Sequence, residues 1–212
     1  ELATEHFSGS LGELVETIVR LRPQLLPAFI DNGLAGMPDP GFTQRSYNVF
    51  NVGEGANMIP ALSATLSLPL QDDLWLEGID IVRQSAARAA TQRKQYQTGP
   101  ISLRFVRGSD ILLADPENVC KFEVIFGGDN ARVRSLANDL VKAHYEALYA
   151  RFGGKVRFHW GQVVPEGTLD APGTHGPRVP ESFPRYGDWK RVRDRYDPIG
   201  RGLNAWQRRI LP

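Results

Sequence analysis

Apolar and polar residues alternate along several short stretches of the chain, as they do in strands that bury one face. Residues 62–70 place leucine and alanine on one side and serine and threonine on the other. Residues 101–106 repeat this alternation, and a third strand is predicted at 121–126, after a loop that contains Asp, Pro and Asn. A fourth strand is predicted at 155–160, directly after a Gly-Gly pair.

Apolar residues spaced three or four apart predict two helices between these strands. The first covers 73–95 and is closed by a Gly-Pro pair. The second begins after Asp129 or Asn130, both of which suit the N-cap position. Its stripe ends at Gly153, where glycine suits the C-terminal cap.

The flanking segments carry weaker patterns. A helix is predicted at 10–22, where a serine precedes helically spaced apolar residues and Pro23 stops the pattern. The stretch from Asn32 to Asn57 is rich in Gly, Pro, Asn and Asp, which favours irregular structure. Residues 164–187 are predicted to form a long loop or strap, and 188–196 a short helix.

The order strand, helix, strand, strand, helix, strand predicts an α+β fold of the ferredoxin-like βαββαβ type. In this fold two helices cover one face of a four-stranded antiparallel sheet. We expect an N-terminal helix and an irregular connecting region over 1–60, the ferredoxin-like domain over 61–163, and a C-terminal strap and helix over 164–212.

Composition excludes several classes of protein. Among 212 residues, 25 Lys and Arg balance 24 Asp and Glu, and this near-neutral charge disfavours a strongly basic nucleic-acid binder. No apolar run approaches the roughly 18 residues that a membrane-spanning helix needs. The single Cys120 precludes an internal disulfide. It does not decide the cellular compartment, although the cytosol is favoured. The spacing of the histidines predicts no zinc site. Because the chain begins at Glu1 and shows no signal peptide, we expect a processed or excised piece.

One face of the predicted sheet is polar. The permanently charged fork of Arg104 suits an anion, a carbonyl oxygen or a reduced cofactor, or else a cross-strand ion pair with Glu123. His159 fits either a hydrogen-bonded structural role or that of a base. The sequence contains no nucleophile elbow, phosphate-binding loop or dinucleotide fingerprint. The residues predicted on this face are Ser63, Thr65, Ser67, Ser102, Arg104, Lys121, Glu123, Arg157 and His159.

Three stretches resemble motifs of one enzyme family. Residues 157–162 read Arg-Phe-His-Trp-Gly-Gln and resemble a His-Trp-Gly-Lys element. Residues 196–204 resemble a terminal Asp-Pro-x-Gly-x-x-x-Asn element, and residues 100–105 a Pro-x-Glu-x-Arg-Phe strand. These motifs belong to FAD-linked oxidases of the vanillyl-alcohol oxidase superfamily, especially the aldonolactone and alditol oxidases. The resemblance covers about residues 60–212.

The resemblance implies a particular place for this chain in a larger assembly. In that family one half binds FAD, a ferredoxin-like cap covers the flavin and shapes the substrate pocket, and the C-terminal segment returns to the FAD domain. The chain would then be the cap with its return segment. Its partner would be an FAD-binding domain on a separate or cleaved polypeptide, or on the rest of a longer chain.

The resemblance also implies roles for individual residues. Arg104 would be a catalytic cation at both substrate and flavin, with His159 and Gln162 as further catalytic residues. Asn204 would help to bind the cofactor. The expected substrate-binding residues are Ser102, Glu123 and Trp160.

Two positions depart from the family pattern. Ser102 stands where polyol-type members carry Glu, and Gln162 where they carry Lys. Both side chains can hydrogen-bond a hydroxyl or carbonyl group, but neither supplies a charge. These departures argue against a plain sugar-acid lactone or alditol and for a less polar or differently shaped substrate. The base stays open among His159, Glu123 and a residue of the FAD-binding half.

Two functions from different classes follow. The first is an FAD-dependent oxidoreductase that oxidises a CH–OH group, with molecular oxygen or another acceptor taking the electrons. The alternative is a non-catalytic ligand-binding or regulatory module on the same fold. A nucleic-acid reader is disfavoured, because the sheet face lacks the aromatic residues that stack on bases.

Overall fold

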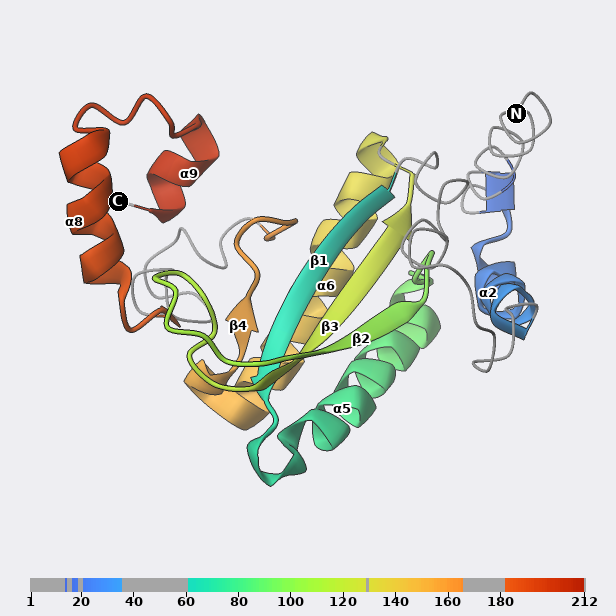
Figure 1. Cartoon of the computed structure of the whole chain (residues 1–212). Coiled ribbons are helices and arrows are strands. Elements are labelled where there is room, and N and C mark those ends of the chain that lie inside the picture. Colours follow the sequence, from blue (N-terminus) through green and yellow to red (C-terminus); the bar gives the residue numbers. More distant parts are fainter. Residues whose placement is uncertain are drawn as a thin grey trace, which may run out of the picture.

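The computed structural model describes residues 14, 17–18, 21–35, 61–128, 130–165 and 182–211, and all structural statements refer to these (Figure 1). The elements in chain order are η1 (Pro23–Leu25), α2 (Leu26–Ala35), β1 (Ala61–Pro69), η2 (Gln71–Asp73), α5 (Leu74–Arg88), η3 (Ala89–Arg93), β2 (Ile101–Val106), β3 (Val119–Gly127), α6 (Ala131–Phe152), η4 (Gly153–Lys155), β4 (Arg157–Phe158), α8 (Tyr186–Tyr196) and α9 (Ala205–Ile210).

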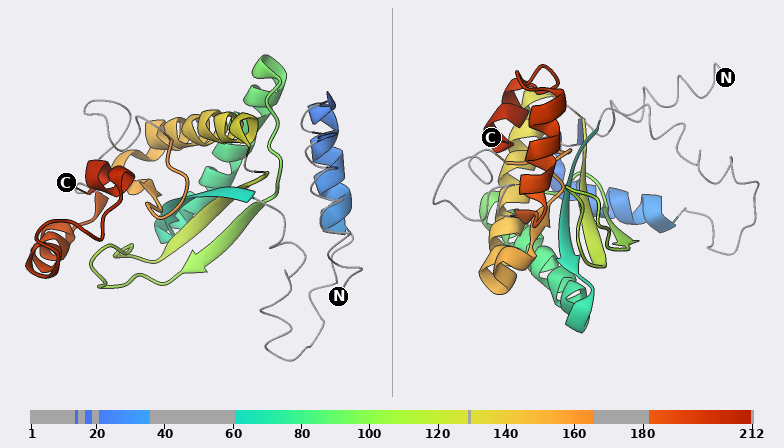
Figure 2. Two further views of the ribbon diagram at one scale, coloured as in Figure 1. Left: turned by 90° about the horizontal axis from the view of Figure 1, so that it is seen from above. Right: turned by 60° about the vertical axis from the view of Figure 1, so that its left-hand side comes forward.

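The strands form one four-stranded sheet in the order β2-β3-β1-β4, and every neighbouring pair is antiparallel. Helices α5 and α6 cover the same face of this sheet, and the other face is turned away from them (Figure 2). The connectivity β1-α5-β2-β3-α6-β4 with this strand order is the ferredoxin-like arrangement. The predicted α+β fold is therefore confirmed.

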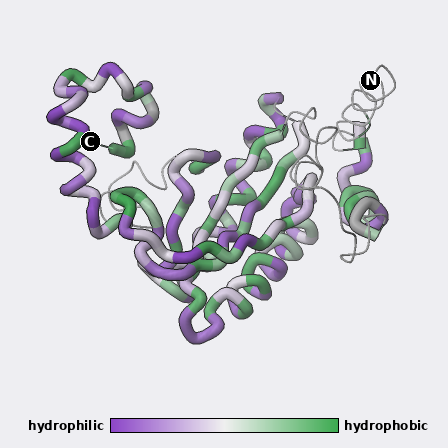
Figure 3. The backbone as a smooth tube through the Cα atoms, viewed as in Figure 1, coloured by the Kyte–Doolittle hydropathy of each residue, from purple (hydrophilic) through white to green (hydrophobic). Residues whose placement is uncertain are grey.

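The core lies between the sheet and the two helices. Leu66 and Phe122 are fully buried, as is Leu148 on α6. Gly78 on α5 lets this helix approach the sheet, because a Cβ atom there would lie 2.6 Å from Leu68 Cδ1 and 3.1 Å from the Phe122 ring. Hydrophilic and hydrophobic positions follow one another along the strands and along α5 and α6 (Figure 3). This periodicity is what made the elements predictable.

Several predicted boundaries were wrong. Irregular structure was predicted from Asn32 onward, but α2 continues to Ala35. The first helix does end before Pro23, because Arg22 has a non-helical backbone, but Pro23 then opens a new helical segment, η1. Pro27 lies in the first turn of α2, where the missing N–H costs no hydrogen bond. In the predicted helix 10–22 the structure describes positions 14, 17, 18, 21 and 22; the first four are helical and Arg22 is not. The rest of that helix, residues 36–57 and the predicted strap over 166–181 lie outside the described residues.

Two further elements are shorter than predicted, and one helix was missed. The helix predicted over 73–95 is α-helical only to Arg88 and ends in a π-helical turn, η3. The predicted fourth strand over 155–160 is reduced to the two residues of β4. Helix α9 was not predicted.

Within the described residues, no helix combines the length and the hydrophobicity that crossing a bilayer requires.

A buried histidine makes the stability of this core depend on pH. His144 on α6 is fully buried, and its Nδ1 lies 3.0 Å from Ser85 Oγ on α5. Burial, followed by the positive charge of Arg93, lowers the pKa of His144 from 6.5 to about 4. Below pH 6.5, His144 of the unfolded chain therefore binds a proton, whereas His144 of the folded chain stays neutral until the pH approaches 4.

We expect the free energy of unfolding to fall by about 3 kcal/mol from this group as the pH drops from 6.5 to 4. Denaturant titrations at pH 7 and pH 4.5 would measure the change. His144→Gln, which keeps a hydrogen-bonding side chain near Ser85, should show a smaller loss. An identical loss in both proteins would contradict the assignment.

Candidate functional site

The open face of the sheet carries two cross-strand rows of polar residues. Antiparallel pairing sets Glu123 of β3 between Ser102 of β2 and Thr65 of β1. It sets Lys121 between Arg104 and Ser67 in the same way. Opposed residues of neighbouring strands point to the same face, so the strand registers bring these side chains together.

The Glu123 carboxylate is the centre of the first row. Glu123 Oε2 accepts a hydrogen bond of 3.1 Å from Ser102 Oγ and is ion-paired with Arg104 Nη2. Gln162 Nε2 lies 3.3 Å from Glu123 Oε1 and 2.9 Å from Ser63 Oγ. We call Ser63, Ser102, Arg104, Glu123 and Gln162 the Glu123 cluster. The Glu123 side chain is 10% exposed and that of Arg104 61%, so the carboxylate is enclosed while the cation reaches solvent.

Gln162 reaches this cluster through an irregularity after β4. His159 N–H donates to Thr65 O, and Val163 N–H donates to Ser63 O. Between these two hydrogen bonds the chain after β4 covers four residues, from His159 to Val163, whereas β1 covers only two, from Thr65 to Ser63. Such a bulge re-aims side chains. It turns Gln162 onto the polar face, whereas plain alternation would place it on the side of Phe158.

The amide of Gln162 has one unsatisfied atom. A carboxylate accepts hydrogen bonds and cannot donate them, so the contact with Glu123 requires Nε2 on that side. Gln162 Oε1 is then buried without a hydrogen-bond partner among the described residues. A buried acceptor of this kind costs free energy until a donor reaches it.

His159 lies at the same bulge with its side chain exposed. Partial desolvation and then the positive charge of Lys121 lower its pKa below the ordinary 6.5. Arg104 acts in the same direction, and the carboxylates of Asp115 and Glu123 oppose it. At neutral pH the imidazole is therefore uncharged and can accept a proton.

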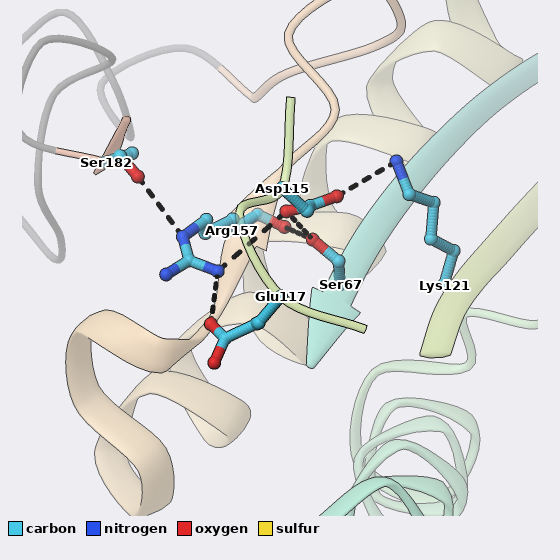
Figure 4. A network of polar contacts seen from close by, with 6 residues as sticks. All are labelled: Ser67, Asp115, Glu117, Lys121, Arg157 and Ser182. Atoms are coloured by element: carbon cyan, nitrogen blue, oxygen red, sulfur yellow. Dashed lines mark hydrogen bonds and ion pairs between the residues drawn. The ribbon is translucent and has the colours of Figure 1, made fainter. Parts of the chain in front are cut away.

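A second polar cluster, drawn in Figure 4, includes Lys121, which lies opposite Arg104 of the first cluster in the pairing of β2 with β3. Asp115, 9% exposed, lies 3.0 Å from Lys121 Nζ and 3.1 Å from Ser67 Oγ. Arg157 Nη1 lies 3.8 Å from Asp115 and 2.9 Å from Glu117. Arg157 Nε also donates to the carbonyl oxygen of Ser182 at 3.1 Å. The Asp115 network, meaning Ser67, Asp115, Glu117, Lys121, Arg157 and Ser182, joins the loop before β3 to β1, β4 and the segment before α8.

Two of the predicted site residues lie apart from these clusters. Trp160 is partly buried and packs against the hydrophobic core. Asn204 caps α9: its Oδ1 accepts from Gln207 N–H at 2.8 Å, and its own N–H donates to Gln207 Oε1 at 3.0 Å. The preceding turn is held by Asp197, which accepts the backbone N–H groups of Arg201 and Gly202 at 2.7 and 2.8 Å. This tail is thus organised by its own local hydrogen bonds.

The structure brings four predicted site residues into the Glu123 cluster and places His159 beside it. Their catalytic and binding roles stay predictions. The site reasoning missed Asp115, because a single Asp in an irregular loop carries no periodic signal. Among the described residues no group of three or more His, Cys, Asp and Glu side chains is placed to hold a metal ion.

Comparison with known proteins neither supports nor opposes these roles. No protein-family model matches the chain, and no curated protein matches it. The functional argument therefore rests on the geometry of the two polar clusters and on the motifs in the sequence.

Proposed function

We propose that this chain forms the substrate-binding part of an FAD-dependent oxidoreductase that oxidises a CH–OH group. One observation carries the proposal: Ser102, Arg104 and Gln162 come from two separate motif-bearing stretches and meet around Glu123. Strand register alone accounts for Ser102 and Arg104, but Gln162 reaches the same carboxylate only through the bulge after β4.

The residues suit a flavin and an alcohol on the open sheet face. Arg104 offers an exposed cation, which stabilises negative charge on a neighbouring group. Gln162 Oε1 accepts no hydrogen bond, and a small movement of the amide would let it accept one from a substrate hydroxyl. Arg104, and by resemblance Asn204, would help to hold FAD, which when bound accepts the hydride from the alcohol carbon.

The chain's own residues would accept the proton of the substrate hydroxyl and stabilise the negative charge on the substrate oxygen. The uncharged imidazole of His159 takes the hydroxyl proton on an unprotonated ring nitrogen. Arg104 stabilises the negative charge that develops on the substrate oxygen. Glu123 holds Ser102, Arg104 and Gln162 in place. Ser102 and Gln162 would hydrogen-bond the substrate.

The first test is a visible absorption spectrum of the intact protein isolated from its natural source. We expect a two-banded flavin spectrum that bleaches when a neutral alcohol substrate is added without oxygen. A panel of alcohols of differing polarity would identify the substrate, and oxygen uptake would show whether oxygen accepts the electrons. A preparation without flavin, with any partner chain retained, would overturn the proposal and favour the ligand-binding or regulatory module.

A further inference from the structure

A second candidate site lies where the end of α5 meets α2 and the first turns of α6. It is a hollow of about 290 Å³ that shares no residue with the Glu123 cluster. Its lining comes from the segments 23–26, 93–96 and 132–139.

The backbone at the end of α5 builds one wall of this hollow. Helix α5 passes into the π-helical turn η3, and Lys94 follows with a φ of 55°, in the left-handed region. Gln95 N–H then donates to Ala89 O at 3.2 Å, which closes the turn. This turn places Arg93 and Lys94 in the lining of the same hollow as Arg132, which lies in the first turn of α6.

The charges in the hollow are not balanced. Arg93, Lys94 and Arg132 form no ion pair with any carboxylate in the described part of the chain. The carboxylate of Asp139 is the one acidic group in the lining, and it accepts a hydrogen bond of 2.8 Å from Gln95 Nε2. Three cations against one carboxylate leave a surplus of two positive charges. The other cationic clusters, in the Asp115 network and on α8, contain ion pairs.

The remaining wall is apolar. Pro23 and Leu26 come from the start of the α2 region, and Tyr96 and Leu136 from the segments that face it. Leu26 is fully buried and packs with Tyr96, so this wall is part of a small core of its own. The hollow therefore combines a doubly positive rim with an aromatic and aliphatic side.

We propose that this hollow binds a small phosphate monoester that carries an apolar or aromatic group. A phosphate monoester has a charge of about −1.5 to −2 at neutral pH and three acceptor oxygens, which matches the surplus charge. Arginine forks bind such oxygens in pairs, and the nearby first turn of α6 also favours an anion. A carboxylate brings only one charge and fits less well. The proposal does not depend on the oxidoreductase function.

Phenyl phosphate is a probe that tests both halves of the hollow. Titration calorimetry with the intact full-length protein should give a dissociation constant of about 1 mM or lower. Inorganic phosphate, which lacks the ring, and benzoate, which lacks the second charge, should each bind at least about tenfold more weakly.

Variants locate the binding. Arg132→Gln and Arg93→Gln should each weaken phenyl phosphate binding at least about tenfold, since each removes a charge-assisted contact. Lys155→Gln removes one exposed charge at the opposite end of α6 and should leave binding unchanged. Melting temperatures of all variants would show whether they fold.

Absence of phenyl phosphate binding would overturn the proposal. So would equal binding of benzoate, or an equal loss in Lys155→Gln, because each would indicate general charge attraction. The flavin spectrum and alcohol turnover should be the same in Arg132→Gln as in the unmodified protein. Failure of this proposal would therefore be distinguishable from failure of the proposed oxidation.

Discussion

Replacing Arg104 by alanine is expected to lower alcohol turnover about 100- to 1,000-fold, the effect of removing one donor that stabilises developing negative charge. Its effect on stability should be about 1 kcal/mol or less, because the arginine side chain is 61% exposed and such ion pairs contribute little. The Glu123 carboxylate would keep two hydrogen-bond donors, Ser102 Oγ and Gln162 Nε2, so it would not be buried without a partner.

Steady-state kinetics and thermal unfolding of the same preparations would measure both effects. Arg83→Ala is the control, since Arg83 also carries an exposed guanidinium paired with a carboxylate, that of Asp80 on α5. Arg104→Lys keeps the charge but not the planar fork and should be impaired to an intermediate degree. Parallel losses of activity and stability in Arg104→Ala would rule out the proposed role of this residue.

Replacing Asp115 by alanine is expected to produce the largest change in folding stability, a loss of about 3 to 5 kcal/mol. Its carboxylate is 9% exposed and faces two enclosed cations, Lys121 and Arg157. Without Asp115 these charges repel one another, and Ser67 Oγ loses its partner at 3.1 Å. The loop before β3 would then lose its side-chain contact with Ser67 of β1 and would keep only Glu117 as its ion-pair partner for Arg157 of β4.

Denaturant unfolding would give the stability change, with Glu117→Ala as the control. Glu117 also pairs with Arg157 but is 40% exposed, so its removal should cost less than about 1 kcal/mol. Asp115→Leu in combination with Lys121→Met would remove the charge pair together and should recover part of the loss. Equal effects of Asp115→Ala and Glu117→Ala would contradict the assignment. In folded Asp115→Ala the pKa of His159 should also fall, because the Asp115 carboxylate raises it.

Prediction from the sequence worked best where one face of an element is buried over its whole length. The predicted strand at 101–106 coincides with β2, and the predicted cap Asn130 accepts the N–H groups of Arg132 and Val133 at the start of α6. The same alternation placed Ser102, Arg104 and Glu123 on one face, and the structure confirms this placement.

Prediction was poorer where backbone geometry departs from a regular period. Gln162 was singled out only through the resemblance to a motif, because a regular continuation of β4 would turn it toward the helices. Helix α9 was missed because its six residues are too few to show a stripe. The hollow at Arg93 and Arg132 depends on a π-helical turn and on the packing of α2, neither of which has a short-range signature.

Hydrophobic periodicity and capping residues were thus sufficient to determine the order of strands and helices within the ferredoxin-like unit, the α+β class and the polar face of the sheet. These features depend on burial along one strand or helix, which neighbouring residues encode. The meeting of Gln162 with Glu123, the enclosure of Asp115 between Lys121 and Arg157, and the doubly positive hollow were decided by tertiary structure. Each of these depends on register, on a bulge or on loop packing between segments distant in the chain, and no local pattern specifies such contacts.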